Sequence, residues 1–94
     1  MSLTPRQRAA LKARAHALEP VVTIGQAGAS EAVIAEVDRS LTAHGLIKVK
    51  LAGADRESRD ALAVTLCDRT GADAVQQVGR VLVLWRPRPD DEPI

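Results

Sequence analysis

Apolar residues recur at helical spacing in three stretches of the chain, and each stretch opens on a residue that caps helices well. We therefore predict three helices, which cover residues 5–18, 31–44 and 56–70. The first begins at a Thr4-Pro5 pair, in which a capping side chain precedes a proline at the first helical position. The second is amphipathic and stops before Gly45, a residue suited to a helix C-terminus.

Four shorter stretches are typical of β-strands, and they lie at residues 21–24, 46–51, 73–78 and 81–86. The stretch at 46–51 alternates, so Lys48 and Lys50 fall on one face of the strand and aliphatic residues fall on the other. The last two strands are separated by Gly79-Arg80, a pair suited to a two-residue type II′ hairpin, and we expect them to pair antiparallel.

The order of these elements, α-β-α-β-α-β-β, predicts the α/β class. Two βαβ crossovers make the first three strands parallel, and their right-handed connections put the crossover helices on one face of the sheet. We expect a two-layer sandwich with a mixed four-stranded sheet, helices on one face, and an open opposite face that carries Lys48 and Lys50. Residues 1–88 should form this single domain, and residues 89–94 should form an acidic flexible tail.

Charge is distributed unevenly along the chain. The formal net charge is +1, from 13 basic and 12 acidic residues, but three of the acids lie in the tail, so residues 1–89 carry 13 basic and 9 acidic residues, or +4. This mild excess permits a polyanionic partner without requiring one. No stretch is long and apolar enough to span a membrane, and the N-terminus lacks an apolar signal core, so we expect a cytoplasmic protein with no membrane role.

The sequence offers little for catalysis. Neither His16 nor His44 lies in an array with metal-ligand spacing, and the single Cys67 is best explained as a small buried side chain. No nucleophile elbow, Walker loop or dinucleotide-binding motif is present. We therefore predict no metal site, no cofactor, no small-molecule substrate and no enzymatic activity.

A Gly-x-x-Gly sequence, Gly25-Gln26-Ala27-Gly28, joins the first predicted strand to the second helix. Glycines at both ends of a tight turn allow a ligand to approach the backbone amides closely, and the N-terminus of the following helix favours anions. Such a loop can hold a phosphate. The same residues also fit an ordinary strand-to-helix turn, because glycines with this spacing are common in turns.

Arg8, Lys12 and His16 are four residues apart and form one stripe on the first predicted helix. The stripe is either a solvated surface or a ligand-binding one. Together with the two strand lysines and the glycine loop it could bind an RNA backbone, as a KH domain does with its own Gly-x-x-Gly loop. Trp85 is the only aromatic residue, which argues against base-stacking platforms of the RRM type, and packing within the fold is its favoured role.

Several short motifs follow one another in an order that covers nearly the whole chain. They include Pro20-Val21-Val22, the glycine loop at residues 25–28, His44-Gly45-Leu46-Ile47-Lys48-Val49-Lys50, Thr70-Gly71-Ala72 and Val81-Leu82-Val83-Leu84-Trp85-Arg86. Together they resemble the CRM or YhbY-like domain family, in its single-domain bacterial form. The resemblance implies an RNA-binding domain with a fold similar to the C-terminal domain of translation initiation factor 3. It also implies a role, because single-domain bacterial members are linked to large ribosomal subunit assembly and multidomain plant members to organelle intron splicing.

The chain departs from the family at two places. Gln26-Ala27 adds no charge to a loop in which the family often has a lysine or another polar residue, and Gly45 replaces the usual acid. At the matching positions, the resemblance implies RNA-binding roles for the loop and for the basic positions Lys12, His16, Lys48 and Lys50.

Three functions remain open at this point. The first is binding of ribosomal RNA or large-subunit precursors, which the loop, the basic stripe and the family resemblance support. The second is a protein-interaction adaptor without direct RNA binding, which the modest net charge and the acidic tail would suit. The third, a small phosphoryl-handling enzyme, lacks any candidate base or metal ligand.

Overall fold

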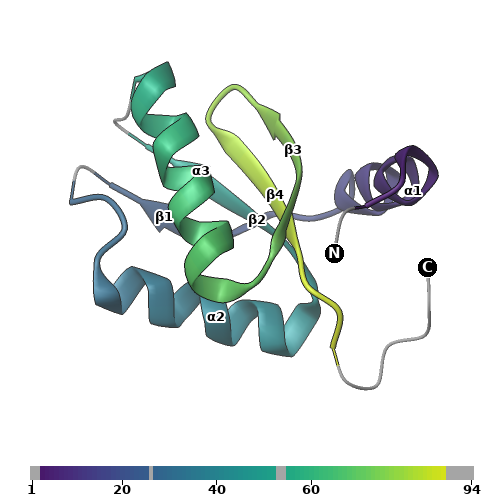
Figure 1. Ribbon diagram of the computed structural model, residues 1–94, viewed down its shortest axis with the longest axis horizontal. Coiled ribbons are helices and arrows are strands. Elements are labelled where there is room, and N and C mark those ends of the chain that lie inside the picture. The colour runs from purple at the N-terminus through teal and green to yellow at the C-terminus, as the bar shows by residue number, and fades with distance from the viewer. Residues whose placement is uncertain (1–2, 26, 53–54, 89–94) are drawn as a thin grey trace.

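The computed structural model describes residues 3–25, 27–52 and 55–88, so Gln26 and the predicted tail at 89–94 lie outside the described residues. The helices are α1 (Pro5–Ala15), α2 (Glu31–His44) and α3 (Arg56–Thr70), and the strands are β1 (Pro20–Ile24), β2 (Leu46–Leu51), β3 (Asp73–Val78) and β4 (Val81–Trp85) (Figure 1). The order is the predicted one, and the bounds of α2, β2, α3 and β3 are confirmed.

The prediction for the first helix was three residues too long. α1 ends at Ala15, and the chain tightens there into a turn in which the Leu18 amide donates to the Ala15 carbonyl at 3.0 Å. This turn lets Leu18 pack against the same apolar cluster as α1, instead of continuing the helix away from the sheet.

The four strands form one mixed sheet in the order β1-β2-β4-β3. β1 pairs parallel with β2, while β4 lies between β2 and β3 and is antiparallel to both. Gly79 has a φ of +57° in the β3–β4 hairpin and Arg80 has no positive φ, as a type II′ turn requires. The predicted α/β class and mixed four-stranded sheet are confirmed.

α2 and α3 cover one face of the sheet. Their apolar residues pack with Ile24 of β1, Val49 of β2 and Leu84 of β4 into the larger core cluster. Each helix is capped as predicted, since the side chains of Ser30 and Asp55 accept hydrogen bonds from backbone amides of the first turn. The bond from the Ser58 amide also lowers the pKa of Asp55.

α1 packs on the opposite face of the sheet, which corrects the expectation of helices on one face only. Leu11 and Ala15 of α1 are buried against Leu46, Val83 and Trp85, which lie on β2 and β4. These strand residues alternate with the ones that face α2 and α3, so the two clusters are separated by the sheet. The second face is therefore open only where α1 does not reach.

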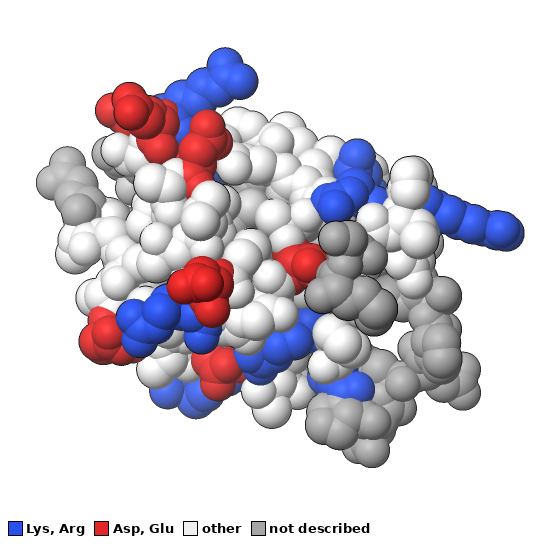
Figure 2. Space-filling view, viewed as in Figure 1, with Lys and Arg blue, Asp and Glu red and all other residues white. Residues whose placement is uncertain are grey.

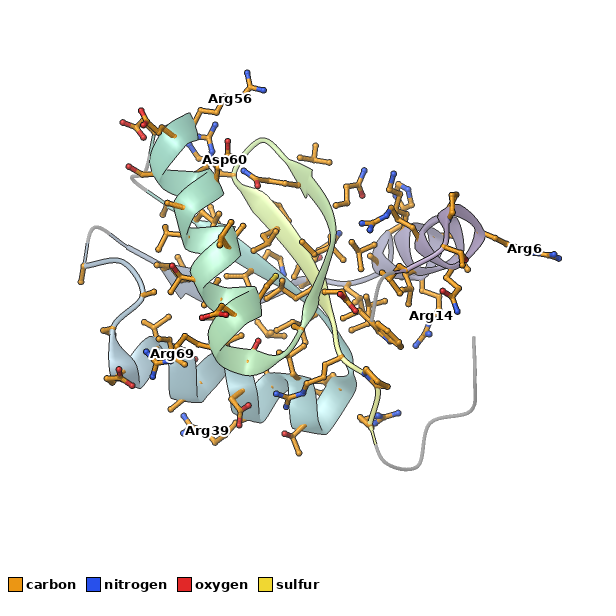
Figure 3. All side chains as sticks on the ribbon, in the orientation of Figure 1. Arg6, Arg14, Arg39, Arg56, Asp60 and Arg69 are labelled. Carbon is orange, nitrogen blue, oxygen red and sulfur yellow. The ribbon has the colours of Figure 1, made fainter. Side chains whose placement is uncertain are left out.

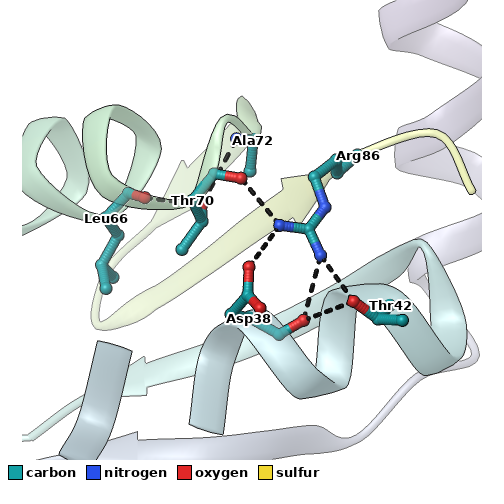
Figure 4. Close-up of polar contacts among 6 residues, drawn as sticks. All are labelled: Asp38, Thr42, Leu66, Thr70, Ala72 and Arg86. Atoms are coloured by element: carbon teal, nitrogen blue, oxygen red, sulfur yellow. Dashed lines mark hydrogen bonds and ion pairs between the residues drawn. The ribbon is translucent and has the colours of Figure 1, made fainter. Parts of the chain in front are cut away.

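Arg86 ties the end of β4 to both helices of the larger layer (Figure 4). Its guanidinium donates to the Asp38 carboxylate at 2.6 Å, to the Asp38 carbonyl at 3.0 Å and to the Thr42 hydroxyl at 2.8 Å, all on α2. It also donates to the carbonyl of Thr70, the last residue of α3, at 2.7 Å. One side chain thus satisfies an otherwise open carbonyl at a helix C-terminus and links two helices to the strand.

Candidate nucleic-acid interface

Three of the predicted basic residues meet in one groove. Lys12 lies on α1, His16 is the C-cap of α1, and Lys48 lies on β2, and all three line a groove of about 380 Å³ between the helix and the sheet. Sequence spacing put the first two on one helical stripe, but only the packing of α1 on this face brings them beside Lys48. Lys50 follows two residues later on the same face of β2 and is exposed.

Arg8, the remaining member of the predicted stripe, is engaged within the protein. Its guanidinium donates to the Ala74 carbonyl at 2.5 Å and to the Val75 carbonyl at 2.9 Å, both on the edge strand β3. The register of β3 shifts between Ala74 and Gln76, so Arg8 holds the strand at its irregular point. Arg8 therefore anchors α1 to the sheet, and the same contact occupies carbonyls at an open strand edge.

Two backbone hydrogen bonds link the described residues at the glycine loop and the start of α2. The Gly28 amide donates to the Gly25 carbonyl at 3.1 Å, and the Ser30 amide donates to the Gly28 carbonyl at 3.0 Å. Gly28 has a φ of +71°, a value that side-chain-bearing residues rarely adopt, whereas Gly25 has no positive φ. A phosphate at this loop would therefore meet amides other than those of Gly28 and Ser30.

The loop and the basic face are joined by the pairing of β1 with β2. Thr23 pairs with Lys50 and Ile24 pairs with Leu51. The end of β1, where the glycine loop begins, therefore lies beside the end of β2, the strand that carries both lysines. Among the described residues beyond its chain neighbours, a Cβ added at Gly25 would meet no atom within 4 Å, so the surface is open there. Lys50 is consequently the predicted cation closest in register to the glycine loop.

Acidic residues are concentrated on the other side of the molecule. Three lie in α2 and four lie in α3 or at its N-cap, interspersed with arginines, whereas α1 contains none. Figure 2 shows acidic and basic side chains side by side over α2 and α3 but only basic ones over α1. Figure 3 shows Arg6 and Arg14 extending from α1, well away from Arg39 of α2 and Arg69 of α3, the two helices that form the helical layer. The small net charge thus conceals a cationic face.

Two acids of α2 are already paired with arginines. Glu31 of α2 accepts two hydrogen bonds from Arg69 of α3, at 2.9 Å and 3.1 Å, and this contact lowers the pKa of Glu31. Asp38 is paired with Arg86. No such ion pair is recorded for Lys12, Lys48 or Lys50 in the described part of the chain.

Trp85 packs within the fold, as favoured from the sequence. Its side chain is 9% exposed and belongs to the cluster beneath α1, so it offers no surface for base stacking. Cys67 is a half-buried free thiol whose pKa is raised by burial and by the nearby Asp73.

The residues that sequence reasoning missed are Gln76, Val78 and Val81, which line the groove opposite α1.

Two further observations concern the described ranges alone. Within residues 3–25, 27–52 and 55–88, no helix has the length and apolarity that crossing a membrane requires. The same ranges contain no group of three or more His, Cys, Asp or Glu side chains that could hold a metal ion.

The fold and the face define a small α/β domain with a cationic sheet surface next to a glycine loop. Comparison with known proteins identifies the family, because residues 3–86 match the model of the CRS1 / YhbY (CRM) domain. The chain belongs to this family.

Similar proteins cover nearly the same length. The chain is 45% identical over 86 residues to an "RNA-binding protein" of Haemophilus influenzae, covering 92% of this chain and 87% of that one. It is 42% identical over 89 residues to a "Probable RNA-binding protein" of Pseudomonas aeruginosa, covering 95% and 86%. The solution structure of the hypothetical protein SAV1595 from Staphylococcus aureus, described as a candidate RNA-binding protein, superposes with a TM-score of 0.85 at 31% identity, covering 97% and 95%.

Proposed function

We propose that this chain is an RNA-binding protein that binds ribosomal RNA or precursor particles of the large ribosomal subunit. One observation carries the proposal: Lys12, His16, Lys48 and Lys50 gather on one face of the sheet, while most acids lie on the other side. A face of this kind attracts phosphates and releases their counterions. The names of the relatives support RNA as the ligand, and the resemblance to single-domain bacterial members supports the assembly role.

In this proposal the RNA backbone crosses the part of the sheet that α1 leaves uncovered, from the groove to the glycine loop. Lys48 and Lys50 are two residues apart on one strand, or about 7 Å, so each can pair with a different phosphate of one RNA strand. Lys12 adds a further cation at the groove end, and His16 adds a ring nitrogen that can hydrogen-bond to the RNA. The loop at Gly25 contributes room for close approach rather than charge, because no atom of the described residues beyond its chain neighbours lies within 4 Å of the position of an added Cβ.

Crosslinking in cells tests the proposal. Cells that express a tagged form of the chain are irradiated, and the RNA fragments attached to the purified protein are sequenced. We expect ribosomal RNA to dominate the library and large-subunit fragments to dominate the ribosomal part. A folded variant with Lys48→Ala and Lys50→Ala should recover far fewer fragments than the parent.

Two outcomes would contradict the proposal. One is a library no richer in ribosomal RNA than that of an untagged strain. The other is co-sedimentation with ribosomal particles that is unchanged by the lysine substitutions and persists after nuclease digestion, since this result would favour the protein-interaction adaptor.

A further inference from the structure

The groove beside α1 has an apolar floor that phosphate binding does not explain. Val78, Val81 and Val83 of the β3–β4 hairpin line it together with Ala15 of α1. Val78 is 59% exposed, Val81 is half-buried and Val83 is buried, so the floor rises from the core to the open edge of the sheet. A surface that only bound phosphates would need no such floor.

Strand pairing fixes the dimensions of this floor. Lys48, Val83 and Gln76 form one row across β2, β4 and β3, so Lys48 and Gln76 lie two strand spacings apart, or about 10 Å. The next row, about 7 Å further along the strands, begins at Lys50 and continues through Val81 and Val78. Valines therefore fill a patch that is bordered by cations on one side and by an amide on the other.

We propose that this groove binds an unpaired nucleobase of the RNA, an inference that rests on the proposed function. The flat face of a base can pack on the valine side chains, which removes apolar surface from water, while Lys12, Lys48 and Lys50 can hold the phosphates on either side of that nucleotide. The volume of about 380 Å³ lies at the low end of the range of small-ligand sites. A double helix cannot enter such a groove, whereas a base splayed out from a single strand can.

Gln76 is the residue that can distinguish one base from another. Its amide offers two donors and an acceptor, and it is half-buried at the groove wall opposite Lys48. A lysine can contact any phosphate, but an amide beside the edge of a base favours the hydrogen-bonding pattern that complements it. We therefore assign specificity to Gln76 and affinity to the cations.

The adjacent Gln77 provides a matched control. It has the same side chain on the same strand, but it pairs with Leu82 and lies on the opposite face, where it lines a different hollow with Arg56 and Asp60. Substituting either glutamine by alanine removes the same atoms from β3. Only Gln76→Ala removes them from the groove.

The experiment measures the affinity of the intact protein for fluorescently labelled short RNAs by anisotropy. The probes are oligonucleotides of uridine, of cytidine and of adenosine, an abasic ribose-phosphate chain of the same length, and an RNA hairpin with a fully paired stem. For the parent protein we expect the preferred single strand to bind at least about fivefold more tightly than the abasic chain, because the base buries apolar surface of the groove. We expect Gln76→Ala to reduce discrimination among the three bases to less than about twofold, and Gln77→Ala to leave it unchanged.

The outcomes separate this inference from the proposed function. If the abasic chain or the paired hairpin binds as tightly as the preferred single strand, the protein still binds RNA but the base-binding groove is refuted. The inference also fails if Gln77→Ala lowers discrimination as much as Gln76→Ala does. If no probe binds, the proposed function itself is contradicted. The abasic comparison uses only the parent protein, so it holds even if a variant fails to fold.

Discussion

Removing the Arg86 side chain should destabilise the domain more than any other single loss of charge. The side chain is 21% exposed and donates four hydrogen bonds, two of them to backbone carbonyls on α2 and α3. A hydrogen bond typically contributes about 0.5–1.5 kcal/mol, so Arg86→Ala should cost roughly 3 kcal/mol. For a domain of this size that corresponds to a fall in Tm of about 12–24 °C. Arg86→Lys should restore less than half of the stability lost in Arg86→Ala, because a lysine ammonium cannot reproduce the planar, forked hydrogen-bonding geometry of the guanidinium.

Arg69 provides the contrast for this experiment. It also pairs with an acid on α2, but the two side chains are 45% and 80% exposed, so solvent screens the pair and Arg69→Ala should leave the Tm close to that of the parent. Thermal melting followed by circular dichroism measures both variants. The explanation is that burial and hydrogen bonds to backbone carbonyls decide how much stability each variant loses. It would be refuted if Arg86→Ala and Arg69→Ala lost equal stability, or if Arg86→Ala lost less than about 1 kcal/mol.

Three other predictions concern the candidate site. Gly28→Ala should cost roughly 1–2 kcal/mol because its φ is +71°, whereas Gly25→Ala should be nearly neutral; comparable melting temperatures for the two variants would contradict this. Arg8→Ala should lower both the Tm and RNA affinity, because Arg8 anchors α1, while Lys12→Ala should lower affinity alone; calorimetry and anisotropy separate the two effects. Deleting residues 90–94 removes three acids, so affinity should stay level or rise slightly, and a weaker complex would count against competition by the tail.

Local signals predicted the elements well. Ser30 and Asp55 predicted the starts of α2 and α3, because capping depends only on residues within one helical turn. The alternation of β2 correctly placed Lys48 and Lys50 on the face away from those two helices. The position of α1 could not be read in this way, because Leu11 and Ala15 define an apolar stripe without saying which face of the sheet it covers. That choice depends on contacts between distant parts of the chain.

A signal for the second apolar layer was nevertheless present in β4. Residues 81–85 are apolar at every position instead of alternating, and four of the five are buried. A strand with this pattern is covered on both faces, so the sheet needed a helix on each side. The groove depends on that layer, so the sequence named Lys12, His16 and Lys48 as RNA-binding residues without showing that they line one groove, and it missed Gln76 and the valine floor.

The salt dependence of RNA binding tests the central claim most directly. Log affinity for a ribosomal RNA fragment is measured against log salt concentration for the parent, for Lys48→Ala with Lys50→Ala, and for Arg39→Ala with Arg56→Ala, which removes equal charge from the helical layer (Figure 3). If the sheet lysines neutralise phosphates, the slope should fall by about 0.7–0.9 for each lysine removed, while the arginine pair leaves it unchanged. An unchanged slope for the lysine pair, or an equal loss for the arginine pair, would contradict the assignment of RNA binding to the sheet face.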